Sequence, residues 1–240
     1  GVDFATERSN NNGGNFFVTS QWLGSGGLPS IHVDQRNVFT NPLELNKVYY
    51  CNDGGVYRYD LDTETFENLS DGLQITQFYD IAVSQTDENV IGGGSQDNGN
   101  MFRDTNGNWD DYARTGDGMN QEIDPTDANV RYWSYQNGGL RRWTNGSNSN
   151  IEPTPTAGAW EMPYKLDPNN ANRIVAGYSE VYSSTNRGDN WISISAGTNF
   201  GGNLEELAIA PSNSNRIYVT RGNQLWVKNT ANNIWTQKSM

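Results

Sequence analysis

The chain has almost no cysteine and little positive charge, and each shortage excludes a class of protein. Cys51 is the only cysteine among 240 residues, so no intrachain disulfide can form, and zinc and redox motifs that need paired cysteines are absent. Lysine and arginine number 16 against 28 acidic residues, which gives a formal net charge of −12. So few cations argue against binding to nucleic acid or to an anionic membrane surface.

Long apolar runs are missing as well. No stretch approaches 18 consecutive apolar residues, and the first four residues lack a basic segment followed by an apolar one. We therefore expect neither a membrane anchor nor a signal peptide, and we interpret the chain as a mature or excised piece. Apolar residues make up only 34%, but 12% aromatic residues supply core groups and 26 glycines supply turns, so the chain should fold.

What the sequence does contain is a repeat. A short apolar run, a turn resembling Asp-Pro-Asn, a second apolar run, a turn marked by glycine and a third run recur five times. The asparagines that close the first turn follow one another at steps of 43, 40, 43 and 43 residues: Asn46, Asn89, Asn129, Asn172 and Asn215. A period of roughly 40 to 45 residues built from strands is typical of a β-propeller blade.

We accordingly predict an all-β fold, a β-propeller of four-stranded blades. The five repeats are expected at about residues 31–70, 71–112, 113–155, 156–198 and 199–240. An N-terminal segment, residues 1–30, contains one convincing strand at 15–19 and is expected to help complete a further or closing blade. An exposed sheet edge is a template for association. If the ring does not close within the chain, a second chain or a neighbouring domain must close it.

The turns carry a family resemblance. Ser184–Trp191 is similar to the Asp-box, Ser-x-Asp-x-Gly-x-x-Trp, with Asn186 in place of the aspartate. Together with Asn52–Arg58, Gly93–Gly99 and Leu166–Arg173, it resembles the Asp-box (BNR-type) propellers of secreted bacterial proteins, a group similar to sortilin-type and xyloglucanase-like propellers. The resemblance covers roughly residues 31–235. It implies a location outside the cell or on its surface, and a structural role for the polar turn and its tryptophan.

Because blade strands alternate in direction, the Asp-Pro turns fall on one side of the propeller and the turns between second and third strands on the other. The second side collects the acidic turns of the first three repeats. We expect its ligand-binding residues to be His32, Asp34, Asp53, Gln96, Asp97, Asp117, Trp133 and Tyr135. Asp and Asn beside glycine are also ordinary turn formers, and the only histidine can be structural, so the alternative for each is a role in the turn itself.

Three function classes compete. The favoured one is a non-enzymatic recognition or adhesion module that binds a glycan or protein, with Trp133, Tyr135, Trp160 and Tyr178 as flat apolar surfaces. The alternative is a xyloglucanase-like glycoside hydrolase, which needs two carboxyl groups about 5 to 9.5 Å apart, with Asp117, Asp97 and Asp53 as candidates. The third is a scaffold whose acidic face is merely solvated.

No cofactor and no structural metal are expected from these residues. Calcium on the acidic face is a minor hypothesis, because several carboxylate and carbonyl oxygens would have to lie at short range. A strongly negative, polar composition fits solubility outside the cell.

Overall fold

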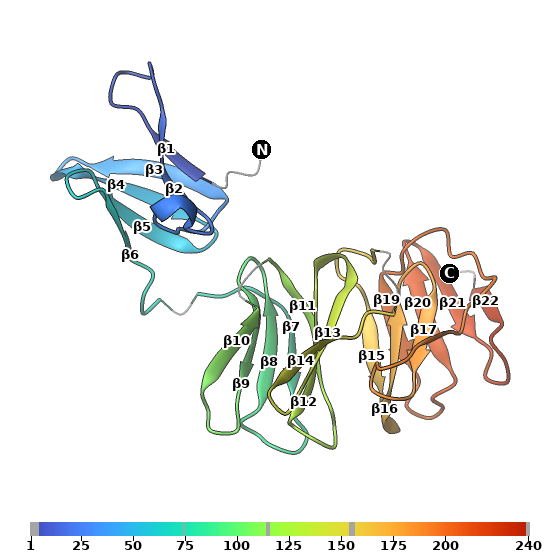
Figure 1. Ribbon diagram of the computed structural model, residues 1–240. Helices are drawn as coiled ribbons and strands as arrows, with labels where there is room; N and C mark the ends of the chain where they lie inside the picture. Colours follow the sequence, from blue (N-terminus) through green and yellow to red (C-terminus); the bar gives the residue numbers. More distant parts are fainter. Residues whose placement is uncertain (1–4, 74, 114–115, 154–156, 239–240) are drawn as a thin grey trace. The chain divides into compact units, whose positions relative to one another are not determined.

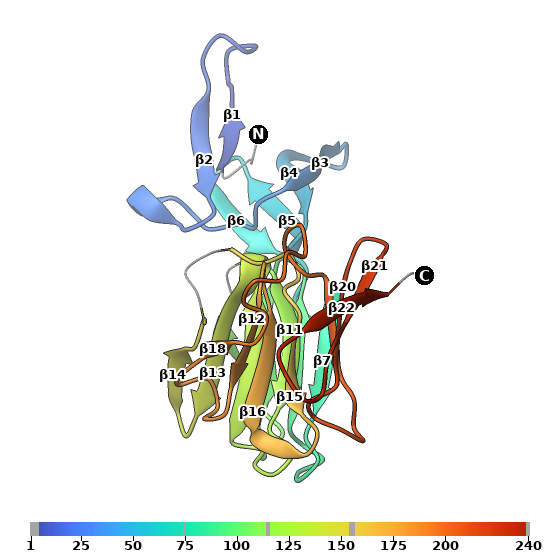
Figure 2. The same cartoon turned by 90° about the vertical axis from the view of Figure 1, so that its right-hand side faces the viewer.

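The computed structural model describes residues 5–73, 75–113, 116–153 and 157–238 and shows an all-β protein (Figures 1 and 2). Its helical segments among these residues are two short 3-10 turns, η1 (Ser25–Gly27) and η2 (Gln136–Gly138). In the part of the chain that the structure describes, no helix has the length and apolar character needed to cross a membrane. The chain divides into two compact units, Gly1–Ile75 and Thr76–Met240.

The first unit contains a hairpin and one four-stranded sheet. β1 (Ala5–Arg8) and β2 (Phe17–Gln21) pair with each other in an antiparallel two-stranded sheet. The N-terminal strand expected at residues 15–19 is therefore present as β2, but it pairs with β1 and adds no strand to a four-stranded blade in this unit. The four-stranded sheet has the order of the sequence: β3 (Gln35–Asn41), β4 (Glu44–Asn52), β5 (Gly55–Asp60) and β6 (Thr65–Asn68).

The second unit contains four antiparallel sheets of four strands, each again in sequence order. The first sheet is β7 (Phe78–Val83), β8 (Ile91–Ser95), β9 (Gly99–Arg103) and β10 (Trp109–Ala113). The second is β11 (Gly118–Ile123), β12 (Val130–Tyr135), β13 (Gly139–Thr144) and β14 (Ser147–Asn150). The third is β15 (Tyr164–Asp167), β16 (Asn170–Gly177), β17 (Val181–Ser184) and β18 (Ile192–Ser193). The fourth is β19 (Glu206–Ile209), β20 (Ile217–Arg221), β21 (Gln224–Lys228) and β22 (Trp235–Lys238).

These sheets confirm the predicted fold class, a β-propeller of four-stranded blades with five repeats. Each predicted repeat range contains one sheet, and only Ala113 at the end of β10 lies one residue beyond its range. In the second unit the first strand of each sheet contacts the first strand of the next, from β7 through β11 and β15 to β19. We call these four the inner strands.

Apolar side chains fill the spaces between successive sheets of the second unit. Between the first two sheets lie Val90, Phe102, Ile123 and Trp133; between the second and third lie Tyr132, Leu140, Met162 and Ile174; between the third and fourth lie Val175, Phe200, Val219 and Trp226. Phe102 meets Trp133 edge to face, with ring centroids 5.9 Å apart. Burial between like sheets is therefore what holds this unit together.

Hydrogen bonds from two tryptophans add a bridge between neighbouring sheets. In the Ser184–Trp191 turn, Asn186 Oδ1 accepts the backbone N–H of Asn190 at 2.9 Å, so the polar side chain closes the turn. The Trp191 indole then donates to Ile151 O in the preceding repeat at 2.8 Å. One repeat later Trp235 does the same to Ile194 O at 2.9 Å. These contacts match the structural role expected for this turn.

Candidate functional site

The turns between second and third strands of the second unit form a connected surface, which we call the turn face. Each turn is bonded through the backbone to the loop that enters the next sheet. The N–H of Gly99 donates to Gly116 O at 3.0 Å, and the N–H of Asn137 donates to Trp160 O at 3.0 Å. One sheet further, the N–H of Leu204 donates to Tyr178 O at 2.9 Å. The loops of this face are thus held in place by their neighbours.

Asp97 and Asp117 lie together within this network. Asp117 Oδ1 accepts the backbone N–H of Asp97 at 3.0 Å, and the N–H of Asp117 itself donates to Gln136 Oε1 at 3.1 Å. Asp117 is only 8% exposed, whereas Asp97 is half-buried and has a left-handed backbone with φ of 59°. The buried carboxylate therefore holds the Gln96–Asn98 turn of the neighbouring sheet, a contact between loops that differs from the role in its own turn weighed from sequence.

Gln96, the neighbour of Asp97, contributes mainly its backbone. Its N–H donates to Gln77 O at 2.9 Å, and its carbonyl accepts the Asn98 side-chain amide at 3.0 Å. Gln96 is half-buried, and Asn98 is exposed at the tip of the turn.

His32, Asp34 and Asp53 lie in the first unit. The His32 carbonyl accepts the side-chain amides of Asn52 at 3.0 Å and Gln35 at 2.7 Å, and the ring packs over Gly54 so closely that no Cβ fits there. Asp53 forms a bidentate ion pair with Arg36. Asp34 has a positive φ of 59°, a conformation that aspartate tolerates in turns. The convergence of these three residues with Asp97 and Asp117 on one rim remains a prediction.

The four candidate aromatic side chains differ strongly in their exposed fraction. Trp133 is fully buried against Phe102, and Tyr178 is 1% exposed with its hydroxyl donating to Gly138 O at 2.6 Å. Neither offers a surface on which a ligand could stack, because the neighbouring sheet covers both. Tyr135 is half-buried, and its hydroxyl accepts from Arg141 Nε at 2.9 Å. Trp160 is 53% exposed on the turn face.

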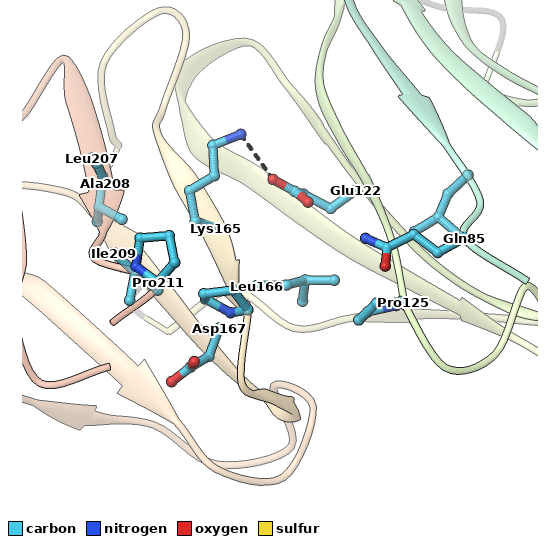
Figure 3. A pocket seen from close by; sticks show the side chains of 12 residues that line it. Gln85, Glu122, Pro125, Lys165, Leu166, Asp167, Leu207, Ala208, Ile209 and Pro211 are labelled. Carbon is cyan, nitrogen blue, oxygen red and sulfur yellow. Dashed lines mark hydrogen bonds and ion pairs between the residues drawn. The ribbon is translucent and has the colours of Figure 1, made fainter. Parts of the chain in front are cut away.

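A pocket of about 360 Å³ lies at the opposite ends of the inner strands, on the side of the Asp-Pro turns (Figure 3). We call it the proline pocket. All four sheets of the second unit contribute to it through β11, β15, β19 and the loop after β7. Its apolar wall includes three prolines from successive turns and aliphatic side chains between them: Pro125, Pro168, Pro211, Ile123, Leu166, Leu207 and Ile209.

Two charged residues that line this pocket, Glu122 and Lys165, form an ion pair. Lys165 Nζ lies 2.8 Å from Glu122 Oε1, and Figure 3 shows the two side chains reaching toward each other from β15 and β11. Burial raises the pKa of Glu122 above its usual value, against the opposing attraction of Lys165. Burial also lowers the pKa of Lys165, but the attraction and hydrogen bond of Glu122, together with the charges of Asp80 and Glu206, outweigh that effect, so the pKa of the lysine is raised. Asp167 is turned away from the pair and is bonded to Arg173 at 2.8 Å.

The sequence analysis missed the proline pocket, because it assigned function to the turn face alone. The signal was nevertheless present in the repeat. Glu122 and Lys165 stand 43 residues apart, at equivalent positions two residues before the aspartate of the Asp-Pro turn. Opposite charges at equivalent positions of successive repeats must meet once the sheets stack side by side. The equivalent prolines 125, 168 and 211 follow the same spacing.

Comparison with known proteins supports the fold. An ancestral GH74 enzyme matches with a TM-score of 0.57 and 20% sequence identity over 85% of this chain and 31% of its own. The GH74 xyloglucanase from Xanthomonas campestris matches with a TM-score of 0.53 and 17% identity, over 83% of this chain and 37% of its own. The chain thus spans about a third of the length of either enzyme. No protein-family model matches the sequence, and no curated protein matches it either.

Proposed function

We propose that the protein is a non-enzymatic recognition module that binds a glycan on the turn face, with Trp160 as the stacking platform. The observation that carries this proposal is the exposure of Trp160, 53%, on a surface where Trp133 and Tyr178 are buried. A flat aromatic ring beside oriented polar groups is the usual composition of a small-ligand surface.

The backbone around Trp160 supports the role, because it is held from both sides. Asn137, at the tip of the neighbouring turn, donates its N–H to Trp160 O at 3.0 Å and accepts the N–H of Gly158 at 2.9 Å. Asn137 is itself exposed and has a left-handed φ of 63°. A platform that is already ordered loses little conformational freedom when a ligand binds.

The experiment is a glycan array that includes xyloglucan oligosaccharides, followed by calorimetry on the best ligand. Xyloglucan is included because one of the matching structures is named a xyloglucanase. We expect Trp160→Ala to weaken binding by about tenfold or more, since truncating an anchoring tryptophan commonly costs over 2 kcal/mol. The matched control is Trp109→Ala, which removes a tryptophan of similar exposure, 54%, from the outer strand β10. Equal losses in both variants, or binding of no glycan, would overturn the proposal.

A hydrolase is the second candidate, and the enzyme names of the two matching structures are the observation that favours it. Its carboxyl pair in the second unit would be Asp97 and Asp117. Against it stands the burial of Asp117, whose Oδ1 already accepts the Asp97 N–H. Release of reducing sugar from xyloglucan, lost in Asp97→Asn, would favour the hydrolase over the recognition module.

We further infer an extracellular or cell-surface location and membership of the Asp-box group. The supports are the negative, polar composition and the turn geometry around Asn186 and Trp191. We also propose that a protein can be a ligand of the turn face. A second chain or a neighbouring domain is proposed to close the propeller ring. Size-exclusion chromatography with light scattering tests for the second chain.

A further inference from the structure

We propose that the proline pocket is a second binding site and that it takes a small organic amine with an apolar body. This inference is independent of glycan recognition, because it concerns the opposite ends of the strands and different residues. Its volume of about 360 Å³ lies in the range of small-molecule sites, and its wall is mostly apolar with a few polar groups, as such sites usually are.

The pocket is built to keep its shape. Pro125, Pro168 and Pro211 come from three successive turns and present rigid rings that have no side-chain rotamer freedom to lose. The second turn is braced further: Asp167 accepts the N–H of Asn169 at 2.9 Å and the hydroxyl of Ser214 at 2.7 Å. Asn169 in turn donates to Pro211 O at 2.9 Å, which ties two of the prolines together.

One acceptor in this pocket is available to a ligand. Glu122 uses Oε1 for Lys165, and among the described residues no hydrogen bond reaches its other oxygen, Oε2. The Glu122 side chain is 22% exposed, so the carboxylate can be reached from the pocket. A ligand ammonium that donates to Oε2 would form a charge-assisted hydrogen bond.

The charges around the inner strands select a cation rather than an anion. Glu122 is influenced by Asp80 on β7, and Lys165 by Glu122, Asp80 and Glu206 on β19. Glu161, just before β15, is in turn influenced by Glu206, Asp80 and Lys165. Four carboxylates therefore face a single ammonium in this region. A bound amine reduces this imbalance, whereas a bound carboxylate increases it.

The experiment is calorimetric titration of the full chain at pH 7 with benzylamine and cyclohexylmethylamine. Benzyl alcohol and benzoate serve as the neutral and anionic counterparts. We expect the amines to bind, and the alcohol and the acid to bind at least about tenfold more weakly, since a hydrogen bond to a charged group contributes more than a neutral one. Absence of heat with both amines at millimolar concentration would overturn the proposal.

Two substitutions of opposite effect then locate the site. Glu122→Gln removes the charge of the acceptor and should weaken amine binding about tenfold or more. Lys165→Met removes the competing ammonium and keeps an unbranched apolar side chain, so amine binding should become tighter. Glu161→Gln is the matched control, since it removes a carboxylate that does not line the pocket, and its effect should be much smaller.

Each outcome of these titrations either supports or contradicts amine binding in the proline pocket. Loss of amine binding in Lys165→Met, or binding of benzoate that depends on Lys165, would assign the pocket to an anion and contradict the proposal. If Glu122→Gln does not fold, the direction of the change in Lys165→Met still discriminates. Failure of glycan binding on the array leaves this result untouched, because Glu122 and Lys165 line the proline pocket and do not lie on the turn face.

Discussion

At the scale of single residues, the acidic side chains of the turn face act first on the backbone. Asp117 is the clearest case: it is 8% exposed and its Oδ1 accepts the N–H of Asp97 at 3.0 Å. A carboxylate accepting a backbone N–H is a charge-assisted bond, which contributes more to stability than a neutral hydrogen bond. Stability is therefore the property that a change at Asp117 should affect first.

We predict that Asp117→Ala lowers the free energy of unfolding by about 1 to 3 kcal/mol, the typical contribution of a hydrogen bond to a charged group. Asp117→Asn keeps an oxygen acceptor in the same place and should recover a large part of this loss. Urea denaturation followed by tryptophan fluorescence measures both. The exposed Asp110→Ala serves as the control. Equal stability of wild type and Asp117→Ala would show that the hydrogen bond is not a stabilising one.

At the scale of elements, the Ser184–Trp191 turn shows how a local motif is converted into contact between sheets. Asn186 closes the turn through the N–H of Asn190, and Ser184 Oγ accepts the N–H of Gly188 at 2.8 Å. Gly188 has φ of 91° and lies against Ile151, so a Cβ there would be both strained and crowded. With the turn held this way, the Trp191 indole reaches Ile151 O.

We predict that Asn186→Ala destabilises the protein by about 1 kcal/mol, the typical net contribution of one hydrogen bond. Asn186→Asp should remain within a few tenths of a kcal/mol, since the aspartate of the related motif supplies the same acceptor. Thermal unfolding by circular dichroism compares the two variants under identical conditions. A larger loss for Asp than for Ala would contradict the assigned acceptor role.

The β4–β5 hairpin of the first unit offers a test by pH. Lys47 bonds the Asp60 carboxylate, which also accepts the N–H of Asp62 at 2.9 Å, and these bonds lower the pKa of Asp60 to about 2. The pKa in the folded state is thus below the ordinary value of 3.8. The resulting stabilisation is complete above that value and is lost as the pH falls from about 3.8 to about 2.

We therefore expect Asp60→Asn to melt at a lower temperature than wild type at pH 7, with the difference shrinking between pH 4 and pH 2. Lys47→Met should show the same pattern, because it removes the main cause of the lowered pKa. Circular dichroism melts at several pH values are the measurement. A difference that stays constant down to pH 2 would mean that the carboxylate charge is not responsible.

At the scale of the whole molecule, charge decides which partners are favoured. Sixteen basic residues stand against 28 acidic ones, and we expect this net charge of −12 to disfavour polyanionic partners. The same excess of carboxylates around the inner strands favours a cation in the proline pocket. Closure of the propeller ring by the N-terminal segment, a second chain or a neighbouring domain stays a prediction.

We predict that the protein is retained on an anion exchanger at pH 7 and passes through a heparin column at 150 mM salt. Binding to phosphate or sulfate polymers requires cations that this chain does not supply in sufficient number. The elution volume on both columns measures the effect. Retention on heparin at that salt concentration would reveal a basic patch that the total charge conceals.

The blades could be predicted from the amino-acid sequence alone. Turn formers such as Pro125, Pro168 and Asn172 act on their own backbone within a few residues, so a repeat of these residues predicts strand, turn and period without knowledge of the rest of the chain. The role of Asn186 in closing its own turn was predictable for the same reason, whereas the role of Trp191 was expected from the resemblance of its turn to the Asp-box.

Which side chains are exposed and which contact one another depends on how the sheets pack. Trp133 in β12 is fully buried, whereas Trp160 in the loop before β15 is 53% exposed, because burial depends on the neighbouring sheet. Glu122 and Lys165 are 43 residues apart and pair at 2.8 Å only because their strands lie side by side. Contacts between repeats arise from stacking, and no local pattern specifies how much surface that stacking leaves open.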